Sequence, residues 1–132
     1  MKPPRLLAVA LLLWAIAVPA VLAEPPPSVR AEVNGLLQAV ERSECEFARN
    51  GTWHDSKTAG AHMRDKYDYL VARDLIGSSE DFIERVGTKS SLSGLAYQVR
   101  CGGGAPLASN TWLRHTLGKL RAAAGGPGKK AS

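Results

Sequence analysis

The sequence predicts an α+β fold, mostly α, with about four helices and a small antiparallel β element in a single disulfide-stapled domain. Four stretches place apolar residues three or four positions apart, which is typical of helices with one buried face. Shorter stretches alternate apolar and polar residues, as strands do. The 132 residues include two cysteines, Cys45 and Cys101, and both follow an N-terminal segment of export type. An even pair in a small exported domain normally forms a disulfide, so we expect these two to be bridged.

Residues 1–23 have the pattern of a cleaved signal peptide. Lys2 and Arg5 precede an apolar run over 6–18, and the small residue Ala23 suits a signal peptidase. A membrane anchor is the alternative, but as a helix the apolar run would rise only about 20 Å, against a hydrocarbon core of about 30 Å. We therefore expect cleavage after Ala23, export to the periplasm, and no stable membrane span afterwards.

The charge balance argues only weakly for an anionic partner. The chain carries 17 basic and 12 acidic residues, a formal charge of +5, and losing Lys2 and Arg5 with the signal peptide leaves +3. Lys129 and Lys130 belong to the segment 125–132, whose Gly, Pro and Lys composition predicts a disordered tail. Without a dense basic tract interleaved with aromatic residues, we expect no nucleic acid as partner. Loose attraction to an anionic envelope component stays open.

A globular domain is expected over 28–124, behind a Pro-rich linker at 24–27. Its first helix is predicted over 28–43, and Ser28 can cap it. Gly35 in the helix interior costs about 1 kcal/mol, which predicts a close contact or a kink there. The apolar face of this helix comprises Val29, Val33, Leu36, Leu37 and Val40.

A short hairpin should follow the first helix. Cys45, Phe47 and Arg49 occupy alternate positions of its first arm. Asn50-Gly51 is a strong turn signal because both residues tolerate positive φ, and the next three residues return as the second arm. A later strand over 96–101 alternates in the same way and ends at three glycines.

Three further helices complete the prediction. The second is capped by Asp55 or Ser56 and runs to about Arg73, the third begins with a capping box at Ser78, and Ser109 can cap the last. Residues 88–94 form a polar loop between the third helix and the later strand. The apolar faces comprise Ala59, Met63, Tyr67 and Leu70 in the second helix, Phe82, Ile83 and Val86 in the third, and Leu113, Leu117, Leu120 and Ala124 in the last.

Several motifs along the chain resemble those of a known family. They are Ser43-x-Cys45-x-Phe47-x-Arg49-Asn50-Gly51, Ala61-His62-Met63-Arg64-x-Lys66-Tyr67, Phe82-Ile83, Ser90-Ser91-x-Ser93-Gly94-x-x-Tyr97-x-Val99-x-Cys101 and Trp112-Leu113. Together they resemble the YfeK-like family of exported bacterial proteins, over roughly residues 30–121. The resemblance implies a Gram-negative periplasmic location and one small domain. It implies no activity, because the family is uncharacterised.

The most suggestive surface lies on the second helix. At 100° per residue, His62, Lys66, Tyr69 and Arg73 fall on one flank, beside the buried face centred on Met63. Such a cationic ridge suits a carboxylate, a phosphate or an acidic protein surface. A solvated helix face is the alternative interpretation, and the neighbouring Asp65 and Asp68 favour it.

Three kinds of chemistry have a simpler alternative interpretation. Ser90, Ser91 and Ser93 could supply a hydrolase nucleophile with a histidine as base, yet serines in such a loop usually form turns. A metal site drawn from His54, Asp55, His62 and Asp65 lacks any ligand motif. The three glycines at 102–104 lack the GK[ST] ending of a phosphate loop. We therefore expect no metal and no cofactor.

These observations favour a periplasmic accessory or binding module that acts through its surface and catalyses no reaction. Its partner would be an acidic periplasmic protein or an anionic envelope component. A small cell-envelope hydrolase using the serine loop and a histidine is the alternative, so enzymatic activity stays open. A third class is a structural helper whose basic surface rests on peptidoglycan or lipid phosphates. The binding residues expected are His62, Lys66, Tyr69, Arg73, Ser90, Ser91 and Ser93.

Overall fold

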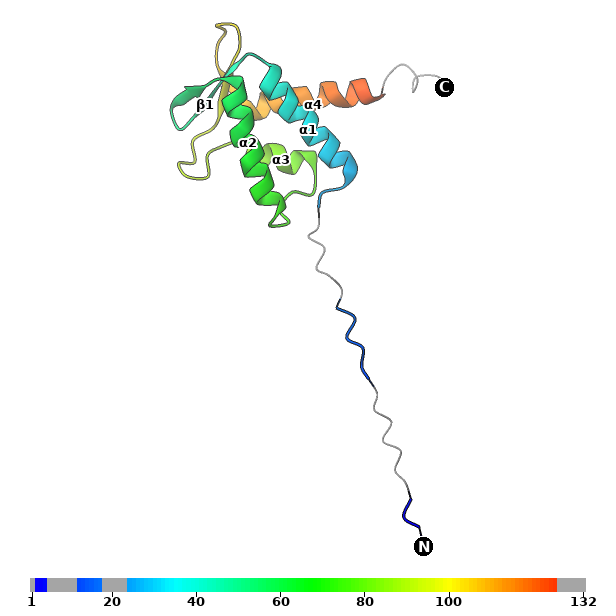
Figure 1. Cartoon of the computed structure of the whole chain (residues 1–132). Helices are drawn as coiled ribbons and strands as arrows, with labels where there is room; N and C mark the ends of the chain where they lie inside the picture. The colour runs from blue at the N-terminus through cyan, green and yellow to red at the C-terminus, as the bar shows by residue number, and fades with distance from the viewer. Residues whose placement is uncertain (1, 5–11, 18–23, 126–132) are drawn as a thin grey trace.

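Helices and sheet pack as one α+β unit, as predicted. The structure is a computed structural model that describes residues 2–4, 12–17 and 24–125. Within residues 24–125, four helices pack beside an antiparallel sheet with the strand order β2-β1-β3-β4 (Figure 1). The helices are α1 (Pro27–Arg42), α2 (Ser56–Val71), α3 (Ser79–Val86) and α4 (Ser109–Gly125), and the strands are β1 (Glu46–Arg49), β2 (Thr52–His54), β3 (Gln98–Arg100) and β4 (Leu107–Ala108).

Helix α1 begins one residue earlier than predicted, and Ser28 is not its cap. Pro26 occupies the N-cap position with no side-chain hydrogen bond, and Pro27 is the first helical residue. Proline suits this position because its fixed φ is helical and the amide it lacks would have had no intrahelical partner. The extended linker therefore ends at Pro26, since Pro27 already belongs to the helix.

The caps of α2 and α3 are as predicted. The Asp55 carboxylate accepts a hydrogen bond from the Thr58 amide at 2.7 Å, and the Ser78 hydroxyl accepts one from the Asp81 amide at 3.0 Å. The Asp81 carboxylate in turn accepts from the Gly77 amide at 2.9 Å, one residue before the position that a capping box would use. Helix α2 ends at Val71, two residues short of the predicted end.

The start of α4 differs from the prediction. Ser109 is the first helical residue, and its fully buried hydroxyl has no hydrogen-bond partner among the described residues, so it does not cap the helix. Its amide instead donates to the Tyr97 carbonyl at 2.9 Å, because the preceding residues form β4 beside β3. Strand β4 was missed, since two residues carry no alternation. Gly125 ends α4 and does not start the tail, and the rest of the predicted tail lies outside the described residues.

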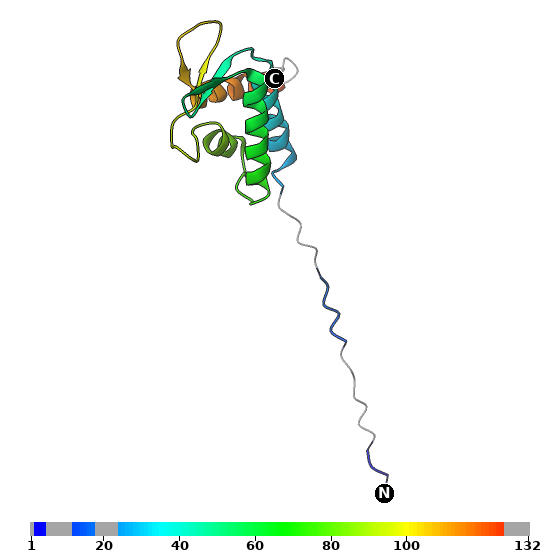
Figure 2. The ribbon, with the colours of Figure 1, turned by 60° about the vertical axis from the view of Figure 1, so that its left-hand side comes forward.

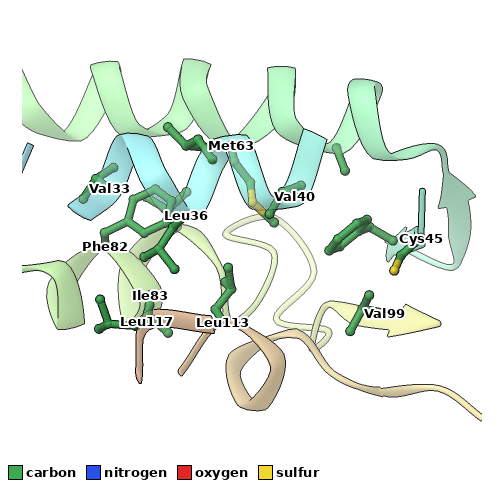
Figure 3. Packing of buried hydrophobic residues seen from close by; sticks show 14 of the residues in the cluster. Val33, Leu36, Val40, Cys45, Met63, Phe82, Ile83, Val99, Leu113 and Leu117 are labelled. Atoms are coloured by element: carbon green, nitrogen blue, oxygen red, sulfur yellow. The ribbon is translucent and has the colours of Figure 1, made fainter. Parts of the chain in front are cut away.

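The core lies between the four helices and the inner face of the sheet. Helix α1 is at its centre and runs beside α2 (Figure 2). Phe82, Leu36 and Ile83 are among its largest fully buried side chains (Figure 3). The close contact predicted at Gly35 is present, because a Cβ there would lie 3.0 Å from Cδ1 of Leu120 on α4. The predicted apolar faces of all four helices contribute to this core, but the prediction was wrong for Ala124, which is exposed because α4 extends past the core there.

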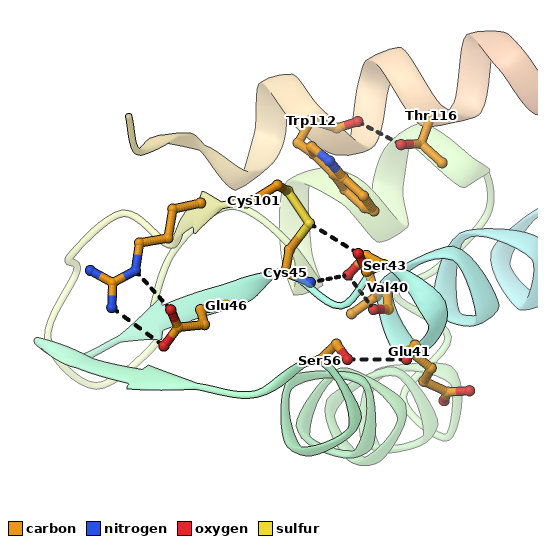
Figure 4. Close-up of a disulfide and its surroundings, with 10 residues drawn as sticks. Val40, Glu41, Ser43, Cys45, Glu46, Ser56, Cys101, Trp112 and Thr116 are labelled. Carbon is orange, nitrogen blue, oxygen red and sulfur yellow. Dashed lines mark hydrogen bonds and ion pairs between the residues drawn. A yellow bond between two sulfur atoms is a disulfide. The ribbon is translucent and has the colours of Figure 1, made fainter. Parts of the chain in front are cut away.

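The predicted disulfide joins β1 to β3. Cys45 and Cys101 are bridged, with Cα atoms 4.4 Å apart, at the end of the register that pairs Glu46 with Arg100 (Figure 4). Cys45 is buried, whereas Cys101 is exposed. The bridge spans 56 positions of the chain, so it links the hairpin to a strand that follows α2 and α3 in the sequence.

The predicted signal peptide falls mainly on residues that the structure does not describe. Ala23 and the start of the apolar run are among them, so cleavage after Ala23 stays a prediction. Over residues 2–4, 12–17 and 24–125, no helix has the length and apolar character needed to cross a membrane.

Candidate functional site

A cleft of about 510 Å³ opens between α2, the β1–β2 hairpin and the loop that leads to β3. Buried apolar side chains form its floor, with Phe47, Met63 and Val86 each at most 6% exposed. Half-buried and exposed polar side chains surround its opening. The lining comprises Phe47, Ala48, Arg49, His54, Ala59, His62, Met63, Asp65, Lys66, Tyr69, Leu70, Val86, Ser91 and Tyr97.

Three of the four ridge residues line this cleft. His62, Lys66 and Tyr69 lie along its α2 wall, whereas Arg73 is outside the lining. The Arg73 guanidinium covers the Tyr69 ring, 3.4 Å from the ring centroid, and donates to the Tyr69 carbonyl at 3.0 Å. The predicted ridge is therefore not continuous along α2, because Arg73 lies in the turn beyond the end of the helix at Val71.

Arg49 fixes the proton position of His62. Its Nη1 lies 3.1 Å from Nδ1 of His62, and a guanidinium can only donate, so Nδ1 accepts and the imidazole carries its proton on Nε2. Burial lowers the pKa of His62, and the charges of Arg49 and His54 lower it further, while Asp65 opposes them. The His54 and His62 rings meet edge to face, with centroids 5.3 Å apart. His62 is thus a neutral side chain whose unprotonated nitrogen is already occupied.

Lys66 connects α2 to the opposite wall of the cleft. Its ammonium donates to the Lys89 carbonyl at 3.2 Å and lies 5.5 Å from the centroid of the Tyr97 ring. Burial lowers the pKa of Lys66, and the charge of Arg49 lowers it further. Burial likewise raises the pKa of Tyr97. The cleft therefore disfavours the charged form of each group while no counter-ion is present.

Arg49 and Lys66 differ from the other shielded cations of the protein. Three arginines in the described part of the chain are half-buried, and two of them form ion pairs, Arg64 with Glu41 at 2.7 Å and Arg100 with Glu46 at 3.1 Å. The third is Arg49, which forms no ion pair with any described residue. Lys66, the half-buried lysine of the described residues, forms none either. The cleft thus shields two positive charges that the domain itself leaves unpaired.

The loop serines have different environments. The buried Ser90 hydroxyl accepts hydrogen bonds from the Leu92 and Ser93 amides at 3.2 and 3.3 Å. The Ser93 hydroxyl donates to the Asn50 side chain at 2.6 Å and so ties the loop to the hairpin turn. Ser91 is exposed and lines the cleft. Ser90 and Ser93 therefore shape the loop, as serines in turns commonly do.

The four candidate metal ligands come together only in part: His54, His62 and Asp65 line the cleft, and Asp55 does not. The Asp55 carboxylate caps α2 by accepting a hydrogen bond from the Thr58 amide. In the part of the chain that the structure describes, no three His, Cys, Asp or Glu side chains come close enough together to hold a metal ion.

Sequence reasoning missed Arg49 and Tyr97 as members of this site, and it considered His54 only as a metal ligand or a hydrolase base. Arg49 did carry a signal, because it has the same alternation parity as Cys45 and Phe47, which places a cation on the inward-facing side of the strand. No sequence signal places His54 and Tyr97 in the cleft, since only the pairing of β2 and β3 with β1 brings them there.

Fold and site together define a small disulfide-bonded α+β domain. Its cleft lies between α2, the β1–β2 hairpin and the loop that leads to β3, and is lined by cationic side chains. The chain belongs to the Family of unknown function (DUF5329), which matches residues 27–121. It is 34% identical over 68 residues to the uncharacterized protein YfeK of Salmonella typhimurium, an alignment that covers 51% of this chain and 55% of the relative. The chain thus matches about half the length of that relative. No solved structure matches it.

Proposed function

We propose that this protein is an exported periplasmic binding module that holds an anionic group in its cleft and catalyses no reaction. One observation carries the proposal: Arg49 and Lys66 are half-buried at one cavity without a carboxylate partner. Shielding a charge from water is unfavourable unless an opposite charge or hydrogen bonds compensate. An anion bound between the two would supply both.

Export is supported by two features that agree. The N-terminal segment has the pattern of a signal peptide, and the domain contains a disulfide, which persists in oxidising compartments. In the periplasm, an anionic envelope component or an acidic protein could provide the group that the cleft accepts.

The hydrolase alternative receives less support from the geometry. Ser91 does share the cleft with His62, but a general base needs a free nitrogen. Nδ1 of His62 accepts from Arg49, and Nε2 already holds the proton. The hydroxyls of Ser90 and Ser93 are engaged within the loop and with Asn50. The arrangement is better suited to donate hydrogen bonds to an anion than to activate a serine.

The proposal is tested on protein expressed from the full chain and recovered from the periplasmic fraction, and recovery there is itself the test of export. Sodium acetate is titrated at constant ionic strength while NMR follows the backbone amide signals of the cleft residues, which every variant retains. We expect a saturable shift that Arg49→Gln or Lys66→Gln reduces at least tenfold in apparent affinity, because each removes one of the two charges that face the anion.

Arg73→Gln is the matched control. It removes the same charge from the turn that follows α2, and Arg73 lies outside the cleft lining. A cleft-specific anion site predicts that Arg73→Gln leaves the acetate affinity within about twofold. The proposal fails if no saturable shift occurs, or if Arg73→Gln weakens binding as much as Arg49→Gln does.

A further inference from the structure

The cleft has two chemically different parts. Its floor is made of carbon-rich side chains from three elements, including Phe47 on β1, Met63 on α2 and Val86 on α3. Its rim carries nitrogen donors on Arg49, Lys66 and other residues. A bare inorganic anion would satisfy the rim and leave the floor in contact with water. A ligand that uses the whole cavity must have both an anionic head and an apolar body.

The rim favours a single negative charge. Arg49 keeps free N–H donors beyond the one that it gives His62, and a guanidinium matches the planar geometry of a carboxylate. Lys66 keeps donors beyond the one that it gives the Lys89 carbonyl. Asp65 also lines the cleft and has no ion-pair partner among the described residues, so its carboxylate would repel a second negative charge.

The floor favours a small molecule over a protein surface. A volume of about 510 Å³ lies within the range of small-molecule sites, which is about 300–1,000 Å³. Such sites bury most of an apolar ligand and use a few polar groups to orient it. An acidic protein surface would bring charge to the rim but no apolar body to fill the cavity.

We infer that the ligand of this cleft is a small organic monocarboxylate with an apolar body, its carboxylate at Arg49 and Lys66 and its body over Met63. The inference rests on the proposed function, since it specifies which anion the same cleft takes. It adds a requirement that anion binding alone does not have: affinity must grow with the apolar size of the ligand.

The test is a series of straight-chain carboxylates from acetate to octanoate, titrated against the exported protein. Each methylene that enters the floor should strengthen binding by up to about fourfold, which corresponds to about 0.8 kcal/mol per buried methylene. The methionines of the chain are Met1 and Met63, so selective ¹³C labelling of methionine methyl groups gives Met63 a signal of its own. Octanoate should shift that signal and acetate should not.

Octanol and octylamine control for the head group. Both carry the same apolar body, but one is neutral and the other is a cation, so each should bind at least tenfold more weakly than octanoate. Arg49→Gln should remove the preference for octanoate over octanol, and Arg73→Gln should keep it.

The outcomes separate the two proposals. If acetate binds at Arg49 but affinity stays flat along the series and Met63 does not respond, the cleft takes an anion and the inference is wrong. If no carboxylate binds at all, the proposed function fails as well. If octanoate binds equally to Arg49→Gln and the unmodified protein, the carboxylate is not at the rim and the inference is overturned.

Discussion

Two clusters of charge in this small domain are built in opposite ways. Arg121 on α4 donates to Glu32 on α1 at 2.8 Å and pairs with Glu80 on α3 at 2.7 Å. Ser79 also donates to Glu32, at 2.7 Å, and the hydrogen bond from Arg121 is the main reason that the pKa of Glu32 is lowered. In the cleft, by contrast, Arg49 has a histidine and no carboxylate as its neighbour.

We infer that the charges around Arg121 stabilise the fold, whereas those in the cleft are available to a ligand. Around Arg121 the donors and acceptors come from three helices of the same chain, so the cluster is complete and ties α1, α3 and α4 together. Around Arg49 and Lys66 the donors converge without an internal carboxylate. Changes to the first cluster should affect stability, and changes to the second should affect binding.

The largest expected effect comes from the disulfide, which attaches the hairpin wall of the cleft to the rest of the sheet. Replacing Cys45 and Cys101 together with alanine should lower the free energy of unfolding by about 4 kcal/mol, because the unfolded chain regains the freedom of a loop of more than 50 residues. Urea denaturation of the oxidised and alanine forms measures the change.

Thiol labelling of the unmodified protein, denatured without reductant, accompanies this measurement. It should find no free cysteine, since both thiols are in the bridge. Two labelled thiols, or an unchanged urea midpoint in the alanine form, would show that the bridge does not stabilise the protein.

A smaller effect separates the two clusters directly. Arg121→Gln leaves Glu32 and Glu80 unpaired and should lower the free energy of unfolding by about 1 kcal/mol, a modest value because the Arg121 side chain is 47% exposed. Arg49→Gln removes a shielded charge that has no carboxylate partner, so the free energy of unfolding should stay within about 0.5 kcal/mol or increase.

Thermal unfolding of both variants in the same buffer makes this comparison. A loss for Arg49→Gln as large as that for Arg121→Gln would mean that the cleft charges hold the fold, and the contrast between the clusters would be wrong.

The smallest expected effect is a dependence of stability on pH through His62. Its pKa in the folded protein is lowered from the ordinary 6.5 by burial and by Arg49. As pH falls through 6.5, the unfolded chain binds a proton at this site before the folded protein does, so stability decreases with falling pH. The loss stops below the folded pKa, where both states are protonated.

His62→Gln should lack this part of the pH profile. The free energy of unfolding is compared between the two proteins from pH 7.5 downward, above the range where Glu32 and Glu80, with ordinary values of 4.5, begin to contribute. Parallel profiles would indicate that His62 is not shielded and that Arg49 does not hold its proton on Nε2.

The sequence was most informative where the structure depends on local pattern. The spacing of apolar residues identified all four helices, and the alternation around Asn50-Gly51 identified the hairpin. Caps at Asp55 and Ser78 followed from single residues whose oxygen can accept an amide. These features depend on neighbours in the chain, which a sequence displays directly.

The sequence was least informative where strands pair. Strand β4 is two residues long, and only its position beside β3 defines it. The hydroxyl of Ser109 makes no cap because that pairing fixes the chain just before α4. Predicting the cleft requires the same long-range information. The α2 flank contributes three of its residues, but the pairing of β1 with β3 brings Arg49 and Tyr97 to it.

The Cys45–Cys101 bond also changes the covalent connectivity of the chain. It closes residues 45–101 into a ring, and every residue that lines the cleft, from Phe47 to Tyr97, belongs to that ring. Helices α1 and α4 lie outside it and join it only at its two ends. A protease that cuts once in the exposed 91–96 segment would therefore leave a single molecule, its two pieces still tethered through sulfur. Only reduction would release them, so a nicked cleft can persist where the compartment is oxidising.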